Sequence, residues 1–168
     1  MKSYARFALV IGAFSVALLS AVTQAADPPK GKAPASDVAR GRYLAIIGGC
    51  NDCHTAGYAP TGGQVPEAQW LLGDGAVGFR GPWGTTYAPN LRKVAASMTD
   101  SEWVKYARAL KARPPMPWFT LNQWTESDLR ALHRYIRQLG PPGEAVTAFV
   151  PPDATPKGPV IQWPAPPK

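Results

Sequence analysis

Two cysteines and a histidine stand within five residues of one another, as Cys50-Asn51-Asp52-Cys53-His54. They are the only two cysteines in the chain of 168 residues. Cysteines separated by two residues serve as a redox pair, as metal ligands or as the attachment points of a haem. The histidine that follows directly favours the third use, because C-x-x-C-H is the attachment signature of a c-type haem.

The spacing of this motif matches the geometry of the cofactor. Two intervening residues let the thiols of Cys50 and Cys53 reach both vinyl groups on one porphyrin edge, and His54 then lies under the iron as proximal ligand. A thioredoxin-like redox pair would need a strand–helix context, which the pattern does not indicate. We do not expect a zinc site, because it would need more cysteine or histidine ligands than the chain offers. One motif predicts one covalent haem c.

A distal iron ligand is expected from the stretch Pro114-Pro115-Met116-Pro117, which lies between two predicted helices. The prolines stiffen the segment, so Met116 can be held over the iron. The other candidates for the distal ligand are Met98 and His133. Met98 is expected to pack locally before a helix, and His133 is expected to be a half-exposed helical histidine. An open iron site is the remaining alternative. A closed His/Met iron has no vacancy for oxygen, which is typical of an electron carrier and not of a catalyst.

The first 25 residues have the pattern of a secretory signal peptide. Lys2 and Arg6 are followed by an apolar run over residues 7–22, and Ala25 ends a small-residue cleavage site before Ala26. An uncleaved anchor is the alternative, but the run is shorter than the roughly 20 residues of a comfortable span. We therefore predict cleavage of this segment and a periplasmic mature chain.

The charge of the chain limits its partners. Removing Lys2 and Arg6 with the signal lowers the formal charge of +7 by two, to +5. A modestly basic protein is steered toward acidic partner surfaces. Nucleic acid is not expected as a partner, because no long run of lysine and arginine is present. We expect no transmembrane segment after cleavage of the signal, because no second apolar stretch is long enough.

Helical patterns flank the motif and the Met116 segment. Apolar and small residues recur at helical spacing from Ser36 to the Gly48-Gly49 pair. The residues 99–102 form a capping box, and a last helix begins near Thr125 and ends before Gly140. Between the motif and the capping box, residues 55–97 are rich in glycine. This composition predicts a long loop that packs on the haem. Its expected apolar contacts are Trp70, Leu71, Leu72, Phe79, Trp83 and Tyr87.

The chain resembles the class I c-type cytochromes. More narrowly, it is similar to the cytochrome modules of bacterial periplasmic dehydrogenases, such as the cytochrome subunits of alcohol dehydrogenases. The resemblance covers about residues 36–140. The residues that carry it are Gly41-Arg42-Tyr43-Leu44, the motif at 50–54, Gly84-Thr85-Thr86-Tyr87-Ala88-Pro89-Asn90, Thr99-Asp100-Ser101-Glu102-Trp103, Pro114-Pro115-Met116-Pro117 and the helix from Leu132 to Leu139.

This resemblance implies an all-α fold in which the first and last helices cross, with Gly41 against Tyr135. It implies thioethers at Cys50 and Cys53. Tyr87 and Asn90 would lie near the propionates or the distal loop, although ordinary turn structure explains both residues equally well. The chain departs from those subunits in having one module and an additional tail.

The implied organisation has four parts. The signal peptide is followed by a flexible lead-in over residues 26–35, a cytochrome c domain over 36–140 and an extended Pro-rich tail over 141–168. Val160, Ile161 and Trp163 are candidates for docking the tail on the domain or on a partner.

The implied function is that of a periplasmic one-electron carrier, not itself an enzyme, between a dehydrogenase donor and an oxidase acceptor. Two alternatives stay open. One is a dedicated cytochrome subunit of a periplasmic dehydrogenase complex, and the other is a haem enzyme or sensor with an open iron.

Overall fold

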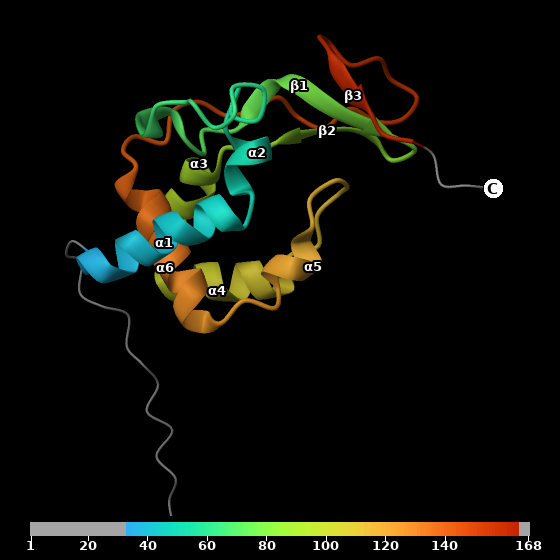
Figure 1. Ribbon diagram of the computed structural model, residues 1–168. Helices are drawn as coiled ribbons and strands as arrows, with labels where there is room; N and C mark the ends of the chain where they lie inside the picture. The colour runs from blue at the N-terminus through green and yellow to red at the C-terminus, as the bar shows by residue number, and fades with distance from the viewer. Residues whose placement is uncertain (1–32, 165–168) are drawn as a thin grey trace, which may run out of the picture.

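The computed structural model describes residues 33–164, so the predicted signal peptide and most of the lead-in lie outside the described residues. Helices α1, α4, α5 and α6 lie together in the lower part of Figure 1, and a small sheet with a long irregular C-terminal segment lies above them. In chain order the elements are α1 (Ala35–Ile47), α2 (Cys50–His54), the 3-10 helix η1 (Glu67–Gln69), β1 (Asp74–Gly81), β2 (Gly84–Ala88), α3 (Leu91–Ala96), α4 (Asp100–Ala109), α5 (Trp118–Leu121), α6 (Glu126–Gln138) and β3 (Val160–Gln162).

Helices α1 and α6 cross at Gly41, as predicted. A Cβ atom at this position would lie 2.1 Å from the carbonyl oxygen of Ala131 and 2.6 Å from the Cβ of Tyr135. Both distances are far below van der Waals contact, so only glycine allows the two backbones to approach this closely. The crossing brings α1, which leads into Cys50, onto the last helix of the described residues.

Helix α4 begins at the predicted capping box. The Thr99 hydroxyl accepts from the Glu102 N–H, and the Glu102 carboxylate accepts from the Thr99 N–H at 2.8 Å. The apolar face of α4 packs with that of α6 in a core that includes Trp103, Leu129 and Ile136. Across residues 33–164, no helix has the length and apolar character needed to span a membrane.

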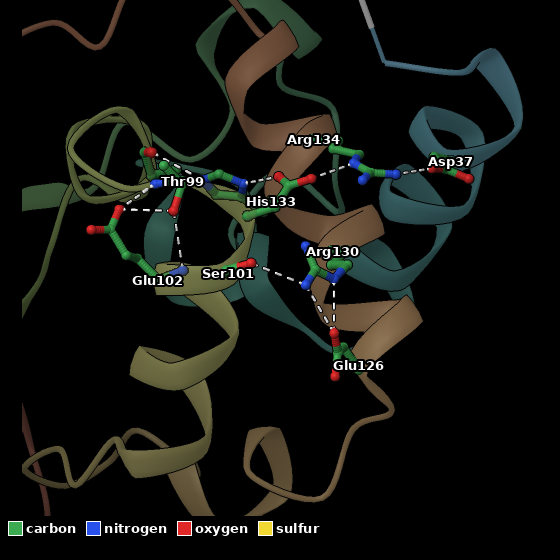
Figure 2. Close-up of polar contacts among 10 residues, drawn as sticks. Asp37, Thr99, Ser101, Glu102, Glu126, Arg130, His133 and Arg134 are labelled. Carbon is green, nitrogen blue, oxygen red and sulfur yellow. Dashed lines mark hydrogen bonds and ion pairs between the residues drawn. The ribbon is translucent and has the colours of Figure 1, made fainter. Parts of the chain in front are cut away.

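A partly buried polar network joins three helices (Figure 2). Arg134 of α6 donates to Asp37 of α1 and, at 2.6 Å, to Asp100 of α4. The ring of His133 lies between Asp100, 2.6 Å from Nδ1, and the carbonyl of Ala95, 3.0 Å from Nε2. The prediction of a half-exposed His133 was therefore wrong. Its side chain is fully buried, with polar groups of α3 and α4 within hydrogen-bond distance of both ring nitrogens.

The prediction of an all-α fold was wrong, because the glycine-rich stretch contains a hairpin. Strands β1 and β2 pair in antiparallel register, and β3 adds in parallel to the other edge of β1. The glycines allow this packing instead of preventing regular structure. A Cβ at Gly78 would lie only 2.5 Å from the Thr85 methyl carbon of the partner strand. Residues 55–97 are thus not one long loop, and they also include α3.

The C-terminal segment is wrapped around the hairpin. We call residues 141–159, which have no regular helix or strand, the belt. Val150 of the belt exchanges two backbone hydrogen bonds with Thr85 on the outer edge of β2. Arg80 of β1 donates to the carbonyl of Pro152, and the chain then returns as β3 on the opposite edge. The candidate docking residues Val160 and Ile161 thus lie in a strand that is paired with the domain itself.

Candidate functional site

The helix α2 carries both cysteines and the histidine of the motif. It starts after Gly49, whose φ of 65° is in the left-handed region that glycine adopts at little cost. A Cβ at Gly48 would lie 2.9 Å from the Trp124 ring. This pair of glycines therefore turns the chain sharply from α1 into α2 and lets Trp124 pack beside the motif.

The side chain of His54 is oriented for binding a metal through one nitrogen. Its Nδ1 lies 2.8 Å from the carbonyl oxygen of Pro89. A carbonyl can only accept, so this contact assigns the ring proton to Nδ1 and leaves Nε2 as a free electron-pair donor. Burial lowers the pKa of His54, although the Pro89 hydrogen bond opposes that shift. The neutral form, which metals require, is thereby favoured.

Backbone and side-chain contacts fix the end of the motif helix. The Thr55 hydroxyl donates to Asn51 Oδ1 at 2.7 Å and accepts from the Leu71 N–H at 2.8 Å. The Gly73 N–H donates to the carbonyl of His54 at 2.8 Å. These bonds hold α2 against the segment that leads into β1. The fold therefore fixes the position of the His54 ring.

The two thiols do not have the properties of a redox pair. Burial raises the pKa of Cys50 to about 11, and burial together with the charges of Asp52 and Asp74 raises the pKa of Cys53. Reactive C-x-x-C pairs instead have a lowered thiol pKa. In the part of the chain that the structure describes, no group of three or more His, Cys, Asp or Glu side chains could hold a metal ion. The raised pKa values of both thiols weaken the redox-pair alternative.

A cavity of about 740 Å³ brings the predicted ligands together. Cys50, Cys53 and His54 line it from α2, and Met116 lines it from the segment between α4 and α5. That segment rises toward the hairpin in Figure 1. The lining is mostly apolar, and its large side chains include Phe79, Trp103, Tyr106, Leu121, Trp124, Leu132 and Phe149.

The cavity also offers polar groups that the described residues leave without a partner. The Nε1–H of Trp103 and the hydroxyl of Thr86 are buried and have no hydrogen-bond partner among residues 33–164. Both residues line the cavity. Buried donors are normally satisfied in a folded protein. A large apolar ligand with polar substituents, such as a haem with its two propionates, therefore fits this lining and this donor set.

The other predicted site residues have different surroundings. Tyr87 contributes to the cavity lining, but its hydroxyl donates to the carbonyl of Lys157 in the belt at 3.4 Å. Asn90 is buried, caps α3 by accepting from the Lys93 N–H, and does not line the cavity. Met98 packs on the hydrophobic core, away from the cavity lining. Among the six expected apolar contacts, only Phe79 and Tyr87 line the cavity, and Trp70 and Leu71 belong to the core.

Two belt residues of the lining, Thr147 and Phe149, were missed by the sequence analysis. The available signal was an isolated aromatic residue in a polar, Pro-rich stretch. This residue, Phe149, gave no indication of what it contacts, because the hairpin beside the belt was predicted to be a loop.

Comparison with known proteins gives one relative. The chain is 28% identical over 138 residues to the fructose dehydrogenase cytochrome subunit of Gluconobacter japonicus. The match covers 74% of this chain and 26% of that subunit, so the chain spans about a quarter of the length of its curated relative. No protein-family model matches the chain. No solved structure matches it either. The chain is thus distantly similar to the cytochrome subunit of a dehydrogenase.

Proposed function

We propose that the chain is an electron-transfer cytochrome that carries one covalent haem c in the described cavity. Cys50 and Cys53 hold the haem by thioether bonds, His54 is the proximal iron ligand and Met116 the distal ligand. The observation that carries this proposal is the meeting of all four residues on one cavity, although Met116 is more than 60 residues from the motif. The group supplies reversible one-electron chemistry when it is bound.

The residues of the chain have separate tasks in this function. Pro89 fixes the tautomer and the ring plane of His54. The apolar lining excludes water, and a thioether from Met116 favours the reduced state. If His54 and Met116 both bound the iron, the haem would have no vacancy for oxygen or peroxide. This argues for a carrier and against the enzyme or sensor with an open iron.

Export to the periplasm is part of the same proposal. It rests on the signal-peptide pattern of residues 1–25 and on the place where haem c is attached in bacteria, outside the cytoplasm. A fusion of residues 1–30 to a reporter that is active only outside the cytoplasm tests it, and an inactive reporter that stays in the cytoplasm would overturn the proposed export.

A permanent place in a dehydrogenase complex is the second candidate. The observation that favours it is the similarity of the chain to a subunit of fructose dehydrogenase. Stable co-purification of the chain with a dehydrogenase at physiological salt supports the subunit. A monomeric chain that exchanges electrons with a dehydrogenase only during collisions supports the free carrier.

The haem assignment is tested by expressing the full chain with haem-maturation machinery. We expect haem to remain with the chain on a denaturing gel, and to be lost when Cys50 and Cys53 are both replaced by alanine. For the distal ligand, Met116→Leu should abolish the ferric absorption band of the methionine–iron bond, and the matched control Met98→Leu should keep it. A chain without covalent haem overturns the proposal, and an unchanged band in Met116→Leu overturns the distal assignment.

A further inference from the structure

A cation–π contact joins the belt to the segment that presents Met116. The guanidinium carbon of Arg113 lies 3.9 Å from the ring centroid of Phe149. Arg113 precedes Met116 by three residues, and the Met116 N–H donates to the carbonyl of Arg113 at 3.3 Å. All three residues line the cavity. The contact therefore connects the turn around Met116 with the opposite, hairpin side of the cavity.

The Met116 segment needs such a contact to keep its place. Residues 110–117 contain no helix or strand, and Lys111, Arg113 and Pro114 are exposed. The prolines restrict the backbone angles within the segment. They do not fix its distance from the hairpin, because the neighbouring helices α4 and α5 anchor only its two ends. A link across the cavity sets that distance, and Arg113 supplies one.

The other side of this link is firmly anchored. Phe149 directly precedes Val150, whose N–H and C=O pair with Thr85 of β2 at 3.0 and 2.8 Å. Gly84, with a φ of 104°, makes room for the belt. A Cβ there would lie 2.4 Å from the Val150 oxygen and 2.9 Å from the Phe149 ring. The Phe149 ring is thus seated by β2 and is not a mobile side chain of a loose tail.

We propose that Arg113 and Phe149 are positioning residues for the distal ligand, and that the belt holds Met116 over the cavity through them. The inference rests on the proposed function, in which Met116 binds the iron. Loss of the contact leaves Cys50, Cys53 and His54 in place, so haem attachment is unaffected. It lets the Met116 segment move away more often, and external ligands then compete more easily for the distal iron position.

The test uses the haem-loaded ferric protein and imidazole as the competing ligand. We expect Arg113→Ala and Phe149→Leu each to raise the apparent affinity for imidazole roughly two- to five-fold, the loss expected for one cation–π contact. Phe149→Leu keeps an apolar side chain and removes only the aromatic face. Phe149→Tyr retains that face and should restore the native affinity. The double variant should exceed neither single variant, because both remove the same contact.

A matched control separates this contact from a general effect of charge. Arg108→Ala removes the same charge from an exposed position of α4 that does not line the cavity. It should leave imidazole affinity unchanged. Arg113→Ala and Phe149→Leu variants that bind imidazole like Arg108→Ala would overturn the positioning role.

A second measurement does not depend on the iron ligand. Amide hydrogen exchange over residues 111–118 should be faster in Arg113→Ala and Phe149→Leu than in Arg108→Ala. Unchanged exchange overturns the inference whatever the ligand is. If the native protein retains haem but lacks the methionine–iron band, the distal assignment under the proposed function fails. In that case faster exchange still supports the inference that the belt holds the Met116 segment in place.

Discussion

The helical half and the hairpin–belt half of the molecule are held together by different kinds of interaction. In the helical half, α1, α4 and α6 meet through apolar faces and the network around Asp100 and Arg134. In the hairpin–belt half, strands and belt are joined mainly by backbone hydrogen bonds and by close contacts at glycines. The cavity lies where the two halves meet, with Met116 on the helical side.

This difference determines how each half should respond to damage. Side chains that converge from three helices make the helical half cooperative, so a single loss there should destabilise the whole domain. The belt is held by separate hydrogen bonds along its length, so losing one should open it locally. The contacts His54–Pro89 and Arg113–Phe149 connect the halves directly beside the proposed haem.

The largest effect is expected from Asp100→Ala. The carboxylate of Asp100 is 9% exposed and accepts hydrogen bonds from both His133 and Arg134. Its removal takes an acceptor from the buried ring of His133 and leaves the partly buried guanidinium of Arg134 with Asp37 alone, which should lower the free energy of unfolding by about 3 kcal/mol. Thermal or urea unfolding of the haem-loaded protein measures the change, and covalent haem content should stay the same.

Glu126→Ala is the control for this variant. Glu126 belongs to an i,i+4 ion pair with Arg130 on the more exposed part of α6, where about 0.5 kcal/mol or less is expected. Equal losses in Asp100→Ala and Glu126→Ala would mean that the network is no stronger than a surface pair. The contrast between the two halves would then be lost.

A smaller loss is expected from Gly41→Ala at the helix crossing. The added methyl group would have to displace the Ala131 carbonyl or the Tyr135 side chain, and such overpacking costs about 1–3 kcal/mol. Alanine is better than glycine in a helix by at most about 1 kcal/mol, so a net destabilisation remains. A raised unfolding temperature in this variant would show that α1 and α6 can separate without cost.

The elements that could be predicted from the sequence depend on local signals. Each of these signals is contained in residues that are close together in the sequence: the capping box at Thr99, the helical spacing in α6 and the motif at Cys50. The hairpin could not be predicted, because Gly78 forms strand only through its contact with Thr85 and through pairing with β3 about 80 residues later. The burial of His133 depends on acceptors from other helices.

The same distinction applies to the candidate site. Met116 was predicted as the distal residue because prolines on either side mark its segment, and the structure brings it to the cavity of the motif. Its role as iron ligand stays a prediction. Phe149 could not be predicted as a residue of the site, because its position there depends on contacts with Arg113 and Gly84, which are far away in the sequence.

A local effect is expected from Arg80→Met in the hairpin–belt half. Arg80 donates to the carbonyl oxygens of Pro152 and Ala154, and methionine keeps the aliphatic length without these donors. We expect faster amide exchange over residues 150–158 and a loss of about 1 kcal/mol in that local stability. The unfolding temperature of the domain should hardly change, and a large drop would mean that the belt is part of the cooperative core.

The smallest effect is expected at the edge of the helical half, where Arg40 of α1 donates to Asp128 of α6 at 2.8 Å. The hydrogen bond from Arg40 lowers the pKa of Asp128, so the pair stabilises the fold above the unfolded-state pKa. This contribution is lost as the pH falls through the lower, folded-state value. Arg40→Gln should therefore lower the unfolding temperature slightly at neutral pH and not at about pH 2. Since the pair is exposed, salt should also reduce the difference in unfolding temperature between Arg40→Gln and the native protein.

The exposed Arg137→Gln is the matched control for Arg40→Gln. An equal pH-dependent change in both variants would assign the effect to net charge and not to the contact between Arg40 and Asp128.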